Sequence, residues 1–520
     1  MVVPEVRAWR AARPHVVRIA GSVKPHVARI TQAVRPRPVK FTTPQLTVVA
    51  AAVGLVLAAG AVAAAGPWDS SGQRTAERDW AASRVGEGGT DHALTSGTSA
   101  TAPRPAPSAG SVLTGLGGST ATGRVPAPAQ KALADVLDPL LNDPALGAER
   151  SAAVVDVATG KRLYDKGAGE SRTPASTTKI ATAVAALSAA GPDHRITTRA
   201  VLEPDTNEVV LVGAGDPTLT AREDAKGCAS LRTLADETAT ALKERHLSQV
   251  TLSYDTSLYS GATVHPIGDN PNLAPVTALM VDEARTDDSD SGTATRSQDP
   301  AGDAAREFEK LLQAKGIKTT SPGLSKATGR SQALASVSSP PMSALVERML
   351  TNSDNDIAEA LARQVALAAG EQASFEGGGR AIGLQLKKLG FPLSGVEFAD
   401  GSGLNRADKL TAGLLTALLA KAGDPAHPEL RPVLTGLPVA GFTGTLTDRY
   451  DTDVSATGVV RAKTGTLTGV NTLAGTVVDT DGRLLAFAFL TSDEASPPQK
   501  EAAQAALDRT ATALAGCGCR

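Results

Sequence analysis

Three short motifs bring together a serine, two lysines and small polar residues, in an order that suits serine acyl transfer. They are Ser176-Thr177-Thr178-Lys179, Ser353-Asp354-Asn355 and Lys463-Thr464-Gly465-Thr466. A serine hydroxyl is a weak nucleophile at neutral pH, so it needs a base within hydrogen-bond reach. Each motif alone is weak evidence, because short polar patterns recur by chance. The ordered set predicts an acyl-enzyme mechanism.

The first motif supplies a nucleophile and a base. Residues three apart on a helix share one face, so Ser176 and Lys179 would lie side by side before the Ala-rich stretch 180–190. Pro174 suits a first helical turn, which puts the serine near the positive end of the helix dipole. A second cation such as Lys463 would help to keep the Lys179 amine neutral. We predict Ser176 as nucleophile and Lys179 as its base.

The second motif lies between two helical patterns, 344–350 and 357–368. Ser353 could pass a proton to a leaving amine, and we predict it as the third catalytic residue. The amide of Asn355 could hold a backbone group of the substrate. Helix capping is the alternative, since Ser, Asp and Asn are favoured N-cap residues, and one residue can do both.

The third motif lies in a β-branched stretch that predicts a strand. Lys463 supplies positive charge, while Thr464 and Thr466 offer hydroxyls to a terminal carboxylate. Gly465 would let the backbone come close to a ligand. The backbone N–H groups of Thr466 and Ser176 would hold an oxyanion. An exposed lysine that protects an edge strand is the alternative interpretation.

At these residues the chain resembles the penicillin-recognising serine enzymes. Further segments narrow the resemblance to class C low-molecular-mass penicillin-binding proteins, the D-alanyl-D-alanine carboxypeptidase/endopeptidase family. The segments are 213–219 (GAGDPTL), 400–405 (DGSGLN), 437–441 (LPVAG) and 444–446 (GTL). The resemblance covers about residues 126–515. The 400–403 run alone fits a tight turn equally well.

The resemblance implies a fold and a function. The fold would be α/β in its α+β form: a penicillin-binding/transpeptidase-like helix–sheet–helix domain with an antiparallel sheet and one inserted domain. Ser176 would attack the penultimate carbonyl of the D-Ala-D-Ala end of a peptidoglycan stem peptide. Ser353 and Lys463 would pass a proton to the departing D-alanine, and β-lactam antibiotics would acylate the same serine. Endopeptidase cleavage of cross-links is the same chemistry, and the sequence does not separate the two.

Two other functions stay open. A class A β-lactamase places a Glu-x-x-x-Asn element after the second motif, whereas here that spelling, at Glu203 and Asn207, precedes it. We interpret it as a chance match in a turn. A catalytically silent cell-wall-binding module would be expected to carry a broken motif, and all three are intact.

The first 125 residues predict where the chain works. Residues 46–65 carry no charge and are long enough to span a bilayer. Segment 1–45 holds nine basic residues and a single acid, so the positive-inside rule keeps it cytoplasmic and exports the chain beyond Ala65. We predict a single-pass anchor in the cell membrane, with 66–125 as a flexible linker. A cleaved signal peptide is the rival, because Ala63-x-Ala65 resembles a cleavage site.

The long interval between the first two motifs predicts an insertion. The catalytic domain would be built from 126–192 and 341–516, with 193–340 inserted. That insert would hold strands at 196–201 and 208–212, helices at 231–245 and 303–315, and a solvated acidic loop at 286–300. Class C enzymes usually carry a longer insert, so a second nested domain would be absent or much reduced.

Other chemistries find little support in the composition. No histidine has metal-ligand spacing, and the 213–215 glycines lack the rest of a nucleotide-binding fingerprint. A net charge of −2 predicts no nucleic-acid partner. We therefore predict no metal and no cofactor. Cys228 could form a disulfide with Cys517 or Cys519, or the two C-terminal cysteines could stay unpaired.

Overall fold

The computed structural model describes residues 128–450, 454–493 and 499–518. The predicted basic segment, membrane anchor and linker, at 1–125, lie outside these residues. Within the described ranges, no helix has the length and apolar character that crossing a membrane requires.

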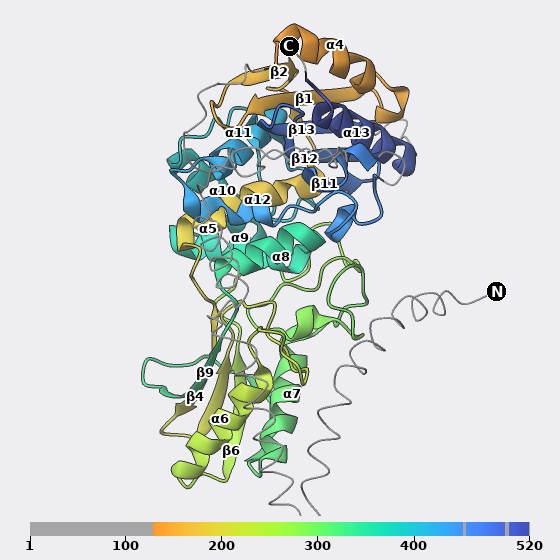
Figure 1. Cartoon of the computed structure of the whole chain (residues 1–520). Helices are drawn as coiled ribbons and strands as arrows, with labels where there is room; N and C mark the ends of the chain where they lie inside the picture. The colour runs from red at the N-terminus through yellow and green to blue at the C-terminus, as the bar shows by residue number, and fades with distance from the viewer. Residues whose placement is uncertain (1–127, 451–453, 494–498, 519–520) are drawn as a thin grey trace, which may run out of the picture. The chain divides into compact units, whose positions relative to one another are not determined.

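One antiparallel sheet of five strands forms the centre of the catalytic part (Figure 1), in the order β11-β12-β13-β1-β2. Its strands are β1 (Glu149–Asp156), β2 (Arg162–Lys166), β11 (Val460–Leu467), β12 (Val470–Val478) and β13 (Leu484–Ser492). The β11–β12 hairpin has a two-residue turn, in which Gly469 takes a positive φ of 73°. Because β1 pairs with β13, segments from both ends of the described chain share this sheet.

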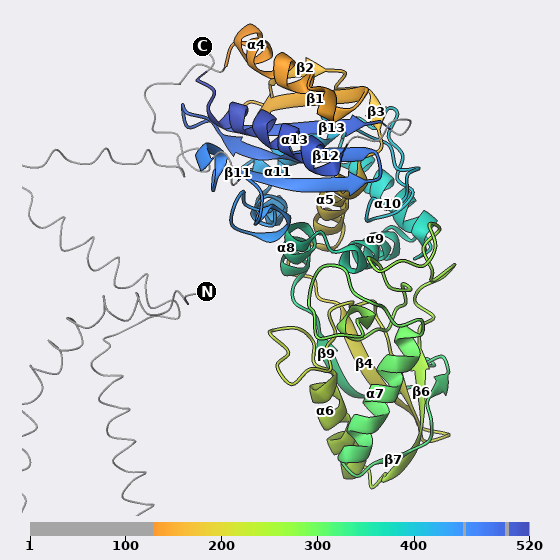
Figure 2. The ribbon, with the colours of Figure 1, turned by 90° about the vertical axis from the view of Figure 1, so that its right-hand side faces the viewer.

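Alternation along the strands sends side chains to two separate cores. On β13, Leu485, Phe487 and Phe489 face helices α4 (Gln130–Leu141) and α13 (Lys500–Ala515). The residues between them face α5 (Thr178–Ala190) and its neighbours. Figure 2 shows the sheet between these helices. The helix–sheet–helix fold is the one that the sequence predicted.

Helix α5 is enclosed by other helices, and its residues from Thr178 to Leu187 are all buried. Its neighbours are α8 (Met342–Asn352), α9 (Asn355–Ala369), α10 (Phe375–Lys388) and α11 (Ala412–Gly423). Alanine predominates in α5 because small side chains let several helices pack closely around one.

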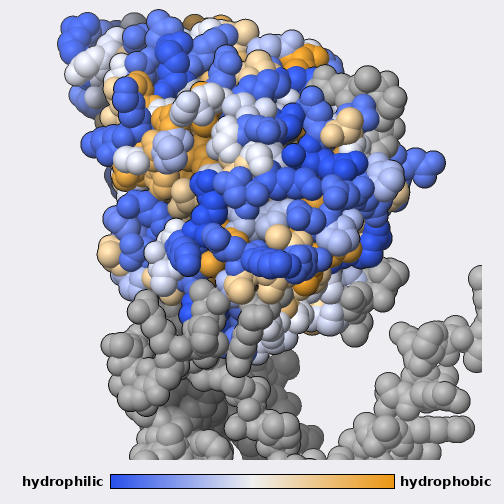
Figure 3. Space-filling view, turned by 90° about the horizontal axis from the view of Figure 1, so that it is seen from above, coloured by the Kyte–Doolittle hydropathy of each residue, from blue (hydrophilic) through white to orange (hydrophobic). Residues whose placement is uncertain are grey.

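Figure 3 shows one face of the molecule, seen from above. The surface of the described residues is mainly hydrophilic there, with smaller hydrophobic patches.

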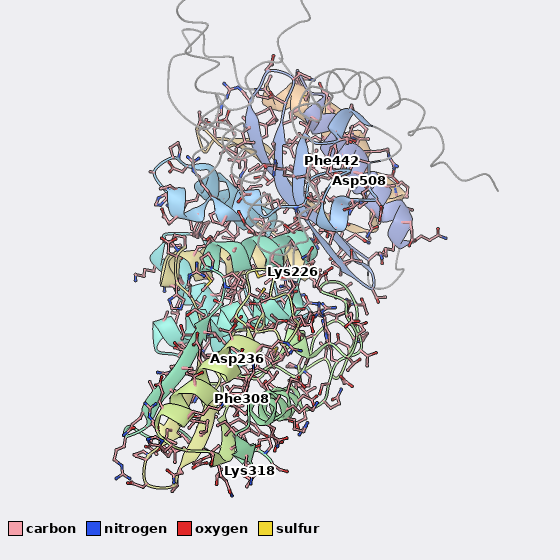
Figure 4. The ribbon with its side chains drawn as sticks, turned by 60° about the horizontal axis from the view of Figure 1, so that its bottom comes forward. Lys226, Asp236, Phe308, Lys318, Phe442 and Asp508 are labelled. Carbon is pink, nitrogen blue, oxygen red and sulfur yellow. The ribbon has the colours of Figure 1, made fainter. Side chains whose placement is uncertain are left out.

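Residues between α5 and α8 build a second sheet, in the order β7-β6-β5-β4-β9, with β8 also paired to β6. Its strands are β4 (Thr197–Glu203), β5 (Glu208–Val212), β6 (Gln249–Asp255), β7 (Lys318–Thr319), β8 (Gly323–Leu324) and β9 (Gln332–Ser338). Helices α6 (Leu231–Glu244) and α7 (Pro300–Ala314) cover it, and the buried Phe308 of α7 lies in the core between them (Figure 4). The Glu203-to-Asn207 spelling falls at the β4–β5 turn, as expected.

One expectation for this region needs correction, and one open question is partly answered. The 286–300 loop is not wholly solvated, because Arg296 is buried and its Nη2 donates to Asp356 Oδ2 at 2.8 Å. The sequence left the cysteines open, as a disulfide of Cys228 or as an unpaired C-terminal pair. The structure fits neither alternative, because Cys228 is a free thiol and Cys517 is disulfide-bonded.

Candidate active site

Ser176 lies in a short 3₁₀ turn, Ala175–Thr177, that leads into α5. The α-helix thus begins at Thr178, two residues after the serine, and Lys179 still lies on the same side as Ser176. The turn is tied to the sheet, because the Thr177 and Thr472 hydroxyls both donate to Pro174 O, at 2.7 and 2.8 Å. Ala175 takes a positive φ of 48°, which costs a non-glycine residue free energy. The nucleophile therefore stands on a fixed, strained turn.

Lys179 has a complete set of hydrogen-bond acceptors. Its Nζ lies 3.1 Å from Ser176 Oγ, 2.7 Å from Asn355 Oδ1 and 2.7 Å from the carbonyl oxygen of Ser402. The side chain is fully buried. The structure thus brings the first two motifs together, with a third acceptor from the 400–405 segment.

Burial sets the protonation of Lys179. It lowers the pKa of the amine to about 8, against carboxylates led by Asp400 and Glu359, which raise it. The predicted contribution of Lys463 to this shift is not the main cause. An amine with a pKa of about 8 has a sizeable neutral fraction near neutral pH, as a general base requires.

The 400–405 segment is a loop wrapped around one carboxylate. Asp400 Oδ1 accepts the N–H groups of Ser402 and Gly403 at 3.0 and 2.6 Å, and Oδ2 accepts that of Asn405 at 2.7 Å. Gly403 has a φ of 82°, and a Cβ there would lie 2.0 Å from Ala175 O. The sequence left open whether this segment is a tight turn or part of the active site. In the structure it is a tight turn, and its Ser402 carbonyl contacts Lys179.

A glutamate of α9 holds the same loop from the other side, and we did not predict it. Glu359 Oε1 accepts the N–H groups of Gly401 and Ser402 at 3.1 and 2.9 Å, while Arg363 Nη1 lies 3.2 Å from Oε2. Both side chains are buried. A charged pair four residues apart within an apolar helix was the available sequence signal.

The second motif occupies the corner between α8 and α9. Ser353 takes a left-handed conformation after α8, and Asp354 caps α9 by accepting the Ile357 N–H at 2.9 Å. Capping is therefore the role of Asp354. Asn355 is engaged at both ends of its amide, because Nδ2 donates to Asn272 O at 2.8 Å. The roles proposed for Ser353 and Asn355 toward a substrate stay predictions.

The third motif is in β11, the strand beside the nucleophile turn. A Cβ on Gly465 would lie 2.7 Å from Pro174 O and 2.1 Å from Thr472 Oγ1. The close approach that Gly465 allows is thus to the turn that carries Ser176. Lys463 is fully buried, and its Nζ donates to Thr464 O at 2.8 Å. Burial lowers its pKa well below the usual range, and the charge of Lys179 lowers it further.

The two threonines of β11 meet flanking elements. Thr464 Oγ1 lies 2.9 Å from Thr445 Oγ1, in the 444–446 run, and Gln504 Nε2 donates to Thr466 Oγ1 at 3.4 Å. Phe442, just before that run, is 64% exposed (Figure 4). Thr445 is another residue that only tertiary structure brings to the motif.

Two buried groups of side chains have the spacing of a metal site within the described residues: His265, Glu359 and Asp400, and Glu283, Asp354 and Asp356. Their carboxylates already have protein partners. Asp400 accepts from His265, and Glu359 pairs with Arg363. Glu283 pairs with Arg285 and Arg348, and Asp356 with Arg296. We interpret both groups as internal ion-pair networks.

A family model matches most of the described chain. It is the D-Ala-D-Ala carboxypeptidase 3 (S13) family, over residues 133–289 and 286–514. The chain belongs to that family. It is a serine-type D-Ala-D-Ala carboxypeptidase, as the motifs and the resemblance predicted.

Two relatives and one solved structure each align with 70–76% of this chain. Carboxypeptidase DacB of Mycolicibacterium smegmatis is 37% identical over 409 residues, which are 76% of this chain and 86% of that protein. The D-alanyl-D-alanine carboxypeptidase of an Actinomadura species is 29% identical over 450 residues, 70% of this chain and 82% of that one. The fold matches penicillin binding protein 4 of Haemophilus influenzae with a TM-score of 0.58, at 22% identity, over 74% of this chain and 98% of that one.

Proposed function

We propose that this carboxypeptidase trims the D-Ala-D-Ala end of peptidoglycan stem peptides through an acyl-enzyme on Ser176. The contact of Lys179 Nζ with Ser176 Oγ, at 3.1 Å, is the observation that carries the proposal. Neutral Lys179 takes the proton of Ser176, whose Oγ attacks the penultimate carbonyl. The backbone N–H groups of Ser176 and Thr466 hold the oxyanion.

Collapse of that intermediate breaks the peptide bond. Ser353 and Lys463 pass a proton to the leaving nitrogen, and D-alanine departs. Water then attacks the ester, which frees the shortened peptide and returns a proton to Ser176. Thr464, Thr466 and Lys463 bind the terminal carboxylate. Cleavage of a cross-link would be the same reaction with a larger leaving group.

Acylation by β-lactams is the same first step with a strained amide. Support comes from the intact motifs and from the solved complex of the Haemophilus protein with a β-lactam, at 21% identity. A β-lactamase would release the product fast, and no glutamate of the kind that directs water follows the second motif in sequence.

The test is labelling of the full-length protein by a fluorescent penicillin, with Ser176→Ala beside it. We expect labelling that persists for many minutes and is lost in the variant. Labelling of the variant would contradict Ser176 as nucleophile. Rapid loss of label would favour the β-lactamase, and a folded but unlabelled wild type would favour a silent wall-binding module.

We also propose that residues 46–65 anchor the enzyme in the cell membrane, with its catalytic part outside. The charge pattern of 1–45 and the uncharged stretch after it support this. The check is membrane fractionation followed by mass measurement. A released protein that begins just after Ala65 would establish a cleaved signal peptide instead.

A further inference from the structure

The inserted residues reach the groups that surround Lys179. His265 is buried, and its Nε2 lies 2.9 Å from Asp400 Oδ2. Asn272, seven positions on, accepts the Asn355 amide N–H through its carbonyl oxygen at 2.8 Å. Asn355 and Ser402 supply the two acceptors that lie 2.7 Å from Lys179 Nζ. The insert thus contacts Asn355 directly, and it contacts Ser402 through Asp400.

The contacts of His265 fix which of its nitrogens carries the proton. Nδ1 accepts the backbone N–H of Ile267 at 3.2 Å, so Nε2 carries the proton and donates it to Asp400. The ring also meets Phe375 edge to face, with centroids 4.9 Å apart. Despite burial, this hydrogen bond and others from the loop lower the pKa of Asp400. The result is a charged Asp400 that can hold three backbone N–H groups.

Asn272 fixes the orientation of the Asn355 amide. With Nδ2 directed at the Asn272 carbonyl, Oδ1 points to Lys179; a flipped amide would set its N–H groups against the lysine. The insert is clamped nearby, because Asp356 accepts the Ala274 N–H at 2.9 Å and pairs with Arg296 at 2.8 Å. The carbonyl of Asn272 is therefore held in place.

Orientation matters because a neutral lysine has two N–H groups and one lone pair. If Asn355 Oδ1 and Ser402 O accept the two N–H groups, the lone pair is left for the Ser176 proton. We infer that residues 265–272 of the insert are a positioning element for the catalytic base, acting through His265 on the 400–403 loop and through Asn272 on Asn355. This inference rests on the proposed role of Lys179.

The test compares His265→Phe, which keeps a ring against Phe375, with His265→Gln, whose amide can still donate to Asp400. The exposed His246 provides the control, His246→Gln. Measured on the full-length protein, the Phe variant should lower the kcat for a D-Ala-D-Ala peptide by about tenfold to a hundredfold. We expect KM to change little, and the Gln and control variants to stay within a few-fold of wild type.

Equal kcat values for wild type and a folded His265→Phe would overturn the inference. So would equal losses in the Phe and Gln variants, because a structural role of the ring would then explain them. If the Phe variant does not fold, His265→Asn replaces it: its shorter amide does not reach Asp400, so it should be slower than the Gln variant, and equal rates would count against the inference. Failure of the proposed function would show differently, as labelling that survives Ser176→Ala in an otherwise wild-type chain.

Discussion

Lys179 and Lys463 stand on the helix side and the strand side of one site, and both are fully buried. Burial lowers the pKa of each. They differ in what surrounds them: carboxylates led by Asp400 and Glu359 oppose the shift at Lys179, whereas the neighbouring charge at Lys463 is Lys179, another cation.

That difference suggests what each lysine is for. The protein supplies the opposing charge for Lys179, so its pKa settles at about 8, where it can exchange a proton. Among the residues that the structure describes, no carboxylate raises the pKa of Lys463 in this way. An anionic substrate would supply one and favour the charged form of Lys463. On this view Lys179 takes the proton of Ser176, whereas Lys463 binds the terminal carboxylate in addition to its part in passing a proton to the leaving nitrogen.

Removing the base should have the largest effect. Lys179→Met keeps the length of the buried side chain but cannot take the Ser176 proton, so the rate of penicillin acylation should fall about a thousandfold or more. Stopped-flow or gel-based labelling measures it, with circular dichroism as the check on folding. A loss below tenfold in a folded variant would contradict the assignment of the base.

Removing the strand lysine should cost less and in a specific way. Lys463→Met should lower kcat/KM for a D-Ala-D-Ala peptide about a hundredfold, through the lost charge-assisted bond to its carboxylate. A peptide with a C-terminal amide is the matched probe. It should be a poor substrate for wild type and should lose less than the acid peptide in the variant, because only the part of Lys463 in proton transfer is then removed. Equal losses on both peptides would argue against carboxylate recognition.

Replacing Glu359, a milder change, should shift the pH dependence of the acylation rate. Because only the neutral amine is a base, acylation by wild type should rise with pH through the Lys179 pKa of about 8. Glu359→Gln keeps an acceptor for the Gly401 and Ser402 N–H groups but removes a charge that raises this pKa. The rise should shift to lower pH, with less than about a tenfold change at the plateau. An unshifted profile would mean that Glu359 acts by position alone.

The smallest effect should be on stability. A lysine whose folded-state pKa is lowered binds fewer protons when folded than when unfolded, so its penalty is full below the folded pKa and fades as pH rises toward 10.5. Lys463→Met removes that penalty and should stabilise the fold by about 1–3 kcal/mol at pH 7. Urea unfolding at pH 7 and pH 10 should show the gain shrinking at the higher pH.

Residue patterns within single segments were enough to predict several helices and strands. β5 has the predicted bounds, and α6 begins at the predicted residue. The β-branched stretch around Lys463 is a strand, as predicted, because branched side chains favour an extended backbone. The start of α5 was less predictable, since Ser176 lies in a 3₁₀ turn that contacts with the sheet hold in place.

The sequence by itself determined which side chains could do the chemistry, because they stand in three recognisable motifs. The spacing within the first motif also places Lys179 within reach of Ser176. Tertiary structure alone decided how that lysine is oriented. Ser402, Glu359 and His265 are far from the motif along the chain, and their contacts arise only when the loop, α9 and the insert pack together. A hydrogen bond between distant residues leaves no local periodicity, so no pattern within one segment could have revealed it.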